Sequence, residues 1–349
     1  MRDPLPNARD LAPARALPLV SWLLTCAVMV AVMVGLGGLT RLTGSGLSMV
    51  QWNPHHILPP LSEAQWREAF ALYQATPEYQ LVNSAMDLAG FKGIFWLEYV
   101  HRLWGRLIGL AFALPLAVFA VKGAIDRPLA RRLGLLLALG AAQGGMGWYM
   151  VASGLVDRPE VSHFRLAAHL VLAVVILGLL LWTALDVARP KVVPAPDSGK
   201  ARRTLVGLLG LTMATIIWGA FVAGLHAGHI HNSFPLMDGN WFPVEGLRLD
   251  PPLRNAVENP AAVQYVHRVL ALTTLVCVTL FGLWCRLARL PAAARRPLAL
   301  AGLFVWLQAG LGITTLLLAV PVPLAALHQM GAVVLFALLT WVLHTVRSG

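Results

Sequence analysis

The sequence predicts an all-α, polytopic membrane protein whose eight transmembrane helices form two tandem four-helix bundles with parallel-topology pseudo-symmetry. Three observations predict this fold class. Of the 349 residues, 58% are hydrophobic and only 12% are charged, whereas a soluble domain has about a quarter charged residues. Eight apolar stretches are long enough to cross a bilayer. Finally, the segments that carry four of the histidines occur as duplicated pairs.

Each apolar stretch comes close to or exceeds the roughly 20 residues that a helix needs to span a bilayer. The stretches lie at 18–39, 94–121, 133–151, 166–185, 205–225, 261–283, 298–320 and 324–346. Lys and Arg gather in alternate connections, at the N-terminus and at 122–132, 189–203, 286–296 and 347. The positive-inside rule then places both termini in the cytoplasm. Topology therefore explains the net charge of +11, and we expect membrane lipid but no nucleic acid as a partner.

The two long outward connections are predicted to differ. In the first, at 40–91, Ser62 and Gln65 form a capping-box pattern and Thr76-Pro77 resembles a second helix start. The second, at 226–260, is rich in Gly, Pro and Asn. Both would lie over the outward ends of the histidine-bearing spans and could roof a site there. Asp3 and Asp10 argue against a mitochondrial transit peptide, so we expect a bacterial inner membrane.

The duplication divides the chain into two halves. EYVHR at 98–102 returns as QYVHR at 264–268, and QGGMG at 143–147 returns as QAGLG at 308–312. Gly37 and Gly46 correspond in the same way to Gly219 and Gly228. Because each half has an even number of spans, the repeats have parallel topology. We expect halves at 1–186 and 202–349, joined by a cytoplasmic linker at 187–201.

Four histidines mark a candidate site in each half. They begin the second, fourth, sixth and eighth spans, at similar outward depth: His101, His169, His267 and His328. Two imidazoles on different helices of a four-helix bundle can ligate a haem iron from both sides. A proton path and ordinary interfacial placement remain alternatives. A zinc site is less favoured, because no Cys or Asp joins either pair.

The two halves differ at one charged position. Glu98 lies three residues before His101, on the same helix face, and its counterpart is Gln264. This asymmetry suggests a catalytic first half and an electron-carrying cofactor site in the second. The alternative is a structural ion pair between Glu98 and Arg102, which are spaced i,i+4.

Other polar residues near these ends are weaker candidates. Four arginines could bind haem propionates or anchor the helices at the interface: Arg102, Arg106, Arg165 and Arg268. A histidine-rich loop segment could bind a metal, through His226, His229 and His231. Cys26, Cys277 and Cys285 lie within spans, so we expect no disulfide in the outward loops.

Several of these segments together resemble the haem A synthase family. They are GGLTRLTGSGLS at 37–48, FWLEYVHRLWGR at 95–106, VSHFRLAAHL at 161–170, NSFPLM at 232–237, YVHR at 265–268 and LHQMG at 327–331. The resemblance covers nearly the whole chain and is closest to the proteobacterial and mitochondrial branch.

The resemblance implies an oxidoreductase that converts the C8 methyl group of haem O to a formyl group by successive hydroxylation, giving haem A for cytochrome c oxidase. It implies a haem b cofactor (iron protoporphyrin IX) held by His267 and His328. His101 and His169 would face the substrate haem, and Glu98 would be catalytic. From their position near the same helix ends, we also expect Arg102 and Arg165 to bind the substrate haem. It also suggests haem O synthase and cytochrome c oxidase assembly factors as partners, and leaves an oligomer open.

Two other functions remain compatible with the residues alone. A di-haem electron carrier would use the same histidines but would have no need of a carboxylate in only one half. A transporter with parallel repeats would bind no haem.

Overall fold

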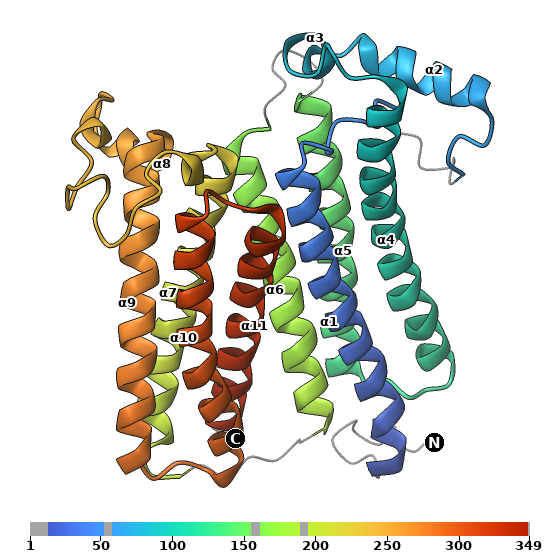
Figure 1. The fold of residues 1–349 in the computed structure, drawn as a ribbon. Coiled ribbons are helices and arrows are strands. Elements are labelled where there is room, and N and C mark those ends of the chain that lie inside the picture. The colour runs from blue at the N-terminus through green and yellow to red at the C-terminus, as the bar shows by residue number, and fades with distance from the viewer. Residues whose placement is uncertain (1–12, 52–57, 155–160, 189–194, 348–349) are drawn as a thin grey trace.

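The chain folds into helices that run side by side as one bundle (Figure 1). The computed structural model describes residues 13–51, 58–154, 161–188 and 195–347, and within these ranges it has no strand. Eight described helices are long and apolar enough to span a membrane. They are α1 (Pro13–Leu42), α4 (Leu88–Val121), α5 (Arg127–Gly154), α6 (His163–Ala188), α7 (Ser198–Gly224), α9 (Pro260–Leu287), α10 (Arg295–Leu317) and α11 (Val322–Thr345). The predicted all-α polytopic fold is confirmed.

All eight spanning helices begin earlier than the apolar pattern predicts, and side-chain caps explain the starts of two of them. α4 begins at Leu88 because the Asp87 side chain accepts a hydrogen bond from the Gly90 N–H at 2.8 Å. α9 begins at Pro260, where the Asn259 side chain accepts from two following N–H groups. These capping residues lie outside the apolar stretches, so hydrophobicity alone does not locate them.

The first long connection forms a cap on α4. The predicted capping box is confirmed, since Ser62 and Gln65 exchange side-chain-to-backbone hydrogen bonds at the start of α2 (Glu63–Gln74). The predicted second start is also confirmed, and begins α3 (Pro77–Leu81). Trp66 and Tyr73 are buried against aromatic side chains at the beginning of α4. We call residues 62–82 the cap.

The second long connection folds through side-chain-to-backbone hydrogen bonds rather than long helices. Its short elements are η2 (Ala227–His229), η3 (Val244–Leu247), η4 (Pro252–Arg254) and α8 (Asn255–Glu258). Asn255 is buried, and its amide accepts from the Leu249 N–H and donates to the Leu249 carbonyl. We call the end of the bundle that carries both connections the loop end.

Helix contacts are similar within the first four spans and within the last four. α1 contacts α4 and α6, and α5 contacts α4 and α6; in the same way α7 contacts α9 and α11, and α10 contacts α9 and α11. One apolar core draws mainly on the first four spans and another on the last four. The two sets meet where α6 and α1 contact α7 and α11. The division into two halves remains a prediction, and 189–194 of the expected linker lies outside the described residues.

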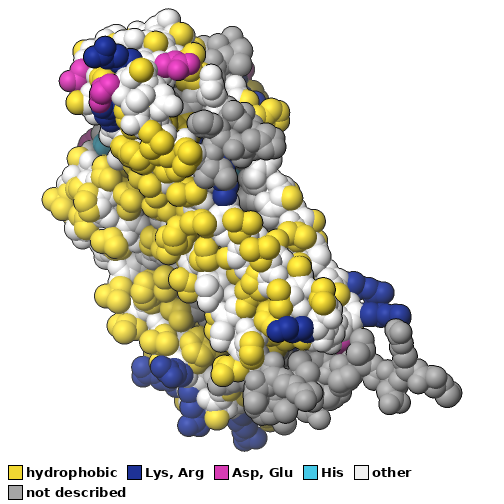
Figure 2. Space-filling view, turned by 90° about the vertical axis from the view of Figure 1, so that its right-hand side faces the viewer, with side chains coloured by type: hydrophobic (Ala, Val, Ile, Leu, Met, Phe, Trp, Pro, Cys, Tyr) yellow, Lys and Arg dark blue, Asp and Glu magenta, His cyan; other side chains and the backbone are white. Residues whose placement is uncertain are grey.

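The end opposite the loops is where α1 begins and α11 ends (Figure 1). Lys and Arg side chains gather there, below a broad apolar surface (Figure 2). Some of the basic residues used in the topology prediction lie outside the described residues: Arg2, Arg9, Arg158, Arg189 and Lys191. The three cysteines lie within helices and are free thiols.

Candidate functional site

The second-half histidines face each other across the bundle. His267 on α9 and His328 on α11 have ring centroids 6.4 Å apart and planes at 87°. Because a metal–imidazole bond is about 2.0–2.1 Å, two imidazoles on opposite sides of one metal ion have centroids roughly 6–6.5 Å apart. The His267 Nδ1–H donates to the Thr215 carbonyl at 3.1 Å, so Nε2 is the unprotonated nitrogen of the neutral imidazole. The pair could therefore hold a haem iron between its two imidazoles.

Each of these rings lies against a glycine of a neighbouring span. A Cβ at Gly219 on α7 would lie 3.1 Å from His267 Cε1, and one at Gly312 on α10 would lie 2.6 Å from His328 Cε1. Both distances are too short for ordinary packing, so the rings occupy space that only a glycine leaves open.

The first-half histidines follow the same pattern. A Cβ at Gly37 on α1 would lie 3.3 Å from His101 Nε2, and one at Gly147 on α5 would lie 3.3 Å from His169 Cε1. The four glycines occupy corresponding positions in the two halves.

A glutamine supports the second histidine of each pair. Gln143 Nε2 donates to the His169 carbonyl at 3.1 Å, and Gln308 Nε2 donates to the His328 carbonyl at 2.8 Å. The two amide oxygens are buried and have no hydrogen-bond partner among the described residues. Sequence comparison of the halves aligned these glutamines but assigned them no role.

The available donors favour haem over a bare metal ion. Within the described ranges, no group of three or more His, Cys, Asp or Glu side chains could hold a metal. Two imidazoles without further ligands do not complete a zinc site, whereas haem supplies four nitrogens of its own. The donor chemistry therefore favours haem over a bare metal ion at both pairs, and the ring spacing supports this at His267 and His328.

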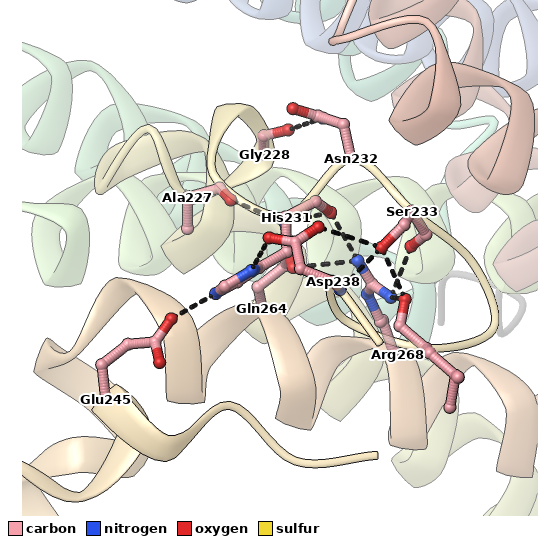
Figure 3. Close-up of polar contacts among 10 residues, drawn as sticks. Ala227, Gly228, His231, Asn232, Ser233, Asp238, Glu245, Gln264 and Arg268 are labelled. Carbon is pink, nitrogen blue, oxygen red and sulfur yellow. Dashed lines mark hydrogen bonds and ion pairs between the residues drawn. The ribbon is translucent and has the colours of Figure 1, made fainter. Parts of the chain in front are cut away.

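An arginine and a glutamine hold the second-half loop in place (Figure 3). Arg268 donates to the carbonyls of His231 and Ser233 at 2.7 and 2.9 Å. Gln264 accepts from Arg268 at 3.0 Å and donates to the Ala227 carbonyl at 2.8 Å. We call this arrangement the second-half clamp.

The loop histidines do not gather as a metal site. His231 lies between two carboxylates, 2.6 Å from Asp238 and 2.7 Å from Glu245 (Figure 3). The hydrogen bond from His231 lowers the pKa of Asp238. His226 instead accepts from Arg41 at 2.9 Å. These contacts give His226 and His231 structural partners.

A carboxylate takes the place of the amide in the first-half clamp. Arg102 forms an ion pair with Glu98 and donates to the carbonyls of Met49 and Gln51 at 2.8 and 3.3 Å. Glu98 Oε2 accepts from the Ser48 hydroxyl at 2.7 Å and from the Met49 N–H at 2.8 Å. The ion pair named above as the alternative for Glu98 is therefore present. Three of the roughly four acceptor positions of the carboxylate are used, which leaves one on Oε1.

The remaining candidate arginines are placed differently. Arg165 lies over the Tyr149 ring, with its guanidinium carbon 4.4 Å from the centroid. Arg106 Nη1 is buried without a hydrogen-bond partner in the described part of the chain. Both can still donate to an anionic group, whereas Arg102 and Arg268 donate to their clamps.

Comparisons with known proteins agree over nearly the whole chain. The family described as "Cytochrome oxidase assembly protein" (COX15-CtaA) matches residues 20–340. "Heme A synthase" of Paramagnetospirillum magneticum is 50% identical over 341 residues, covering 96% of this chain and 95% of the relative. "Heme A synthase" of Nitrosospira multiformis is 46% identical, covering 98% and 97%. "Heme A synthase COX15" of Bos taurus is 44% identical, covering 93% and 81%. With its two histidine pairs and these full-length matches, the chain belongs to the COX15-CtaA family of haem A synthases.

Proposed function

We propose that this protein is a haem A synthase. It oxidises the C8 methyl group of haem O to a formyl group through two hydroxylations, after which the geminal diol loses water. Family membership supports this reaction. The observation that carries it is internal: both halves repeat the histidine, glycine and glutamine contacts, but a buried carboxylate, Glu98, adjoins only one pair. No comparison points to an electron carrier without substrate conversion.

In this proposal the second half holds a resident haem b. His267 and His328 would ligate its iron, and the bound haem supplies one-electron transfer. Thr215 fixes the tautomer of His267, and Gln308 holds the backbone of His328. Such neighbours orient metal-binding imidazoles.

The first half would bind haem O between His101 and His169. Glu98 uses the acceptor position left on Oε1 to bind the hydroxyl of the intermediate or to take up its proton. Arg165 and Arg106 are free to bind propionates, and Arg102 acts through the loop that it holds. We place this half at 1–186 and the cofactor half at 202–349.

A short connection through α1 and α11 joins the two proposed haem sites. Gln329, next to His328, donates to the Val34 carbonyl at 2.9 Å. Its side chain also packs on Gly38, next to the Gly37 that contacts His101. This supports electron transfer between the sites. We further propose an inner-membrane location with cytoplasmic termini, and haem O synthase and cytochrome c oxidase assembly factors as partners.

The test is haem analysis of cells that make haem O but lack haem A. Expression of this protein should produce haem A, identified by extraction and chromatography. The Glu98→Gln variant should keep the absorption spectrum of resident haem and produce at least about 100-fold less haem A. Cells that contain only haem O after expression of the unaltered protein would contradict the proposed function.

A further inference from the structure

The loops of the two clamps are held at corresponding backbone positions. Gly37 and Gly219 correspond, and the same offset pairs Met49 with His231 and Gln51 with Ser233. Arg102 donates to the carbonyls of Met49 and Gln51, at 2.8 and 3.3 Å. Arg268 donates to the corresponding carbonyls of His231 and Ser233, at 2.7 and 2.9 Å. The repeat therefore extends from the helices into the loops.

This register pairs Ser48 with Ile230. Ser48 is 2% exposed and its hydroxyl lies 2.7 Å from Glu98 Oε2. Ile230 has no donor and is 42% exposed. Gln264 needs no hydroxyl donor from the loop. Its neutral amide donates to the Ala227 carbonyl, and its oxygen accepts from Arg268. The first-half loop thus supplies a hydroxyl donor, Ser48, to Glu98, which can only accept.

A buried carboxylate requires donors in its surroundings, since an ionised carboxyl group only accepts. The Ser48 hydroxyl also lies 3.1 Å from the Ser45 carbonyl and 3.4 Å from the Ile94 carbonyl. Its single proton goes to Glu98, which is both nearest and charged. Without this hydroxyl, Oε2 retains one loop donor, the Met49 N–H.

We propose that Ser48 is a positioning residue for Glu98. Its hydroxyl fixes Oε2 against the loop and thereby holds Oε1 where it can accept from the oxidised substrate. This role rests on the function proposed for the first half. The loop itself does not depend on Ser48, because Arg102 and the Met49 N–H hold the same segment.

The experiment compares Ser48→Ala with Ser48→Thr, using the full-length protein in haem O-producing cells. Ser48→Ala should lower haem A formation about 10- to 100-fold, because it removes a hydrogen bond to a charged group. Ser48→Thr retains the hydroxyl and should restore most of the activity. Ile230→Ser, the matched change in the second half, should leave activity unchanged. Resident haem absorption should equal that of the unaltered protein in all variants.

Unaltered activity of Ser48→Ala would overturn the proposal, as would a Ser48→Thr variant as impaired as Ser48→Ala. If Ser48→Ala does not retain haem, the near-isosteric Ser48→Cys decides instead. Its thiol is a weak donor, so reduced activity with intact haem supports the proposal and full activity overturns it. An inactive Glu98→Gln beside a fully active Ser48→Ala would refute the role of Ser48 alone. Absence of haem A from the unaltered protein would refute the proposed function itself.

Discussion

The two clamps differ by one exchanged side chain, to which the proposed function assigns the different roles of the two halves. In the second half, Gln264 both donates to the loop and accepts from Arg268, so both ends of its neutral amide are used in holding the loop. In the first half, Glu98 can only accept, and it retains one acceptor position after its loop and arginine contacts are made. The shared contacts stabilise both loops. The difference adds a buried charge beside one histidine pair only.

The halves also differ in how closely their outer spans pack. In the most apolar part of α4 and of α5, 6% of residues are buried, against 28% in α9 and 17% in α10. More of the first-half helix surface is therefore available to lipid. In the proposed function, this lower burial suits a first half that takes up and releases the substrate haem, and the higher burial suits a second half that keeps its cofactor.

The largest effect is expected from placing a carboxylate in the second-half clamp. Gln264→Glu removes the donor to the Ala227 carbonyl and buries a charge without a serine beside it. We expect a loss of stability of about 2–4 kcal/mol, since Arg268 compensates only in part. Thermal unfolding of the purified protein measures it.

Adding the missing hydroxyl should reverse part of this loss. The double variant Gln264→Glu with Ile230→Ser is expected to unfold at a higher temperature than Gln264→Glu alone. If Gln264→Glu is as stable as the unaltered protein, the second-half clamp accepts a buried carboxylate without a hydroxyl donor, and the proposed difference between the clamps is wrong.

The next effect concerns Glu78, a buried carboxyl group in the cap. Burial, reinforced by the charge of Glu98, raises the pKa of Glu78 from its usual 4.5 to about 7. The folded protein therefore holds this proton more tightly than the unfolded chain, and stability falls as the pH rises from 4.5 to about 7. The shift corresponds to on the order of 3 kcal/mol.

Glu78→Gln should remove this pH dependence. We expect the difference in unfolding temperature between about pH 5 and about pH 8 to be smaller in Glu78→Gln than in the unaltered protein. Exposed Glu68 in α2 provides the matched control, because Glu68→Gln should retain the original difference. An unchanged pH response of Glu78→Gln would show that Glu78 is not a buried acid.

The smallest effect distinguishes the histidine–glycine contacts of the two halves. Gly312→Ala places a Cβ 2.6 Å from its imidazole, while Gly147→Ala places one at 3.3 Å. We expect a cost of about 1–3 kcal/mol and reduced haem retention for Gly312→Ala, and a smaller cost for Gly147→Ala. Equal haem retention by the two variants would argue against the closer contact in the second half.

Sequence reasoning located the spans and the histidines because both depend on features that a sequence displays directly. Long apolar stretches predict helices, and duplicated motifs place the four histidines at the loop end. The Glu98–Arg102 pair was foreseen as an alternative from its i,i+4 spacing.

The clamps could not be foreseen in the same way. Arg102 and Arg268 bind backbone carbonyls of loops, and no side-chain pattern marks which carbonyls approach them. The glycine contacts depend on how closely neighbouring spans approach, which is set by packing across the bundle. One signal in the sequence singles out Ser48: the correspondence of Gly37 with Gly219, continued along the loops, aligns Ser48 with Ile230.

Haem analysis of paired histidine variants tests most directly whether the first half binds the substrate and the second the cofactor. We predict that the purified unaltered protein carries haem b. The double variant of His101 and His169 to Ala should retain that haem and form no haem A, whereas the double variant of His267 and His328 to Ala should lose it. A second-half double variant that keeps its full haem b content would contradict this account.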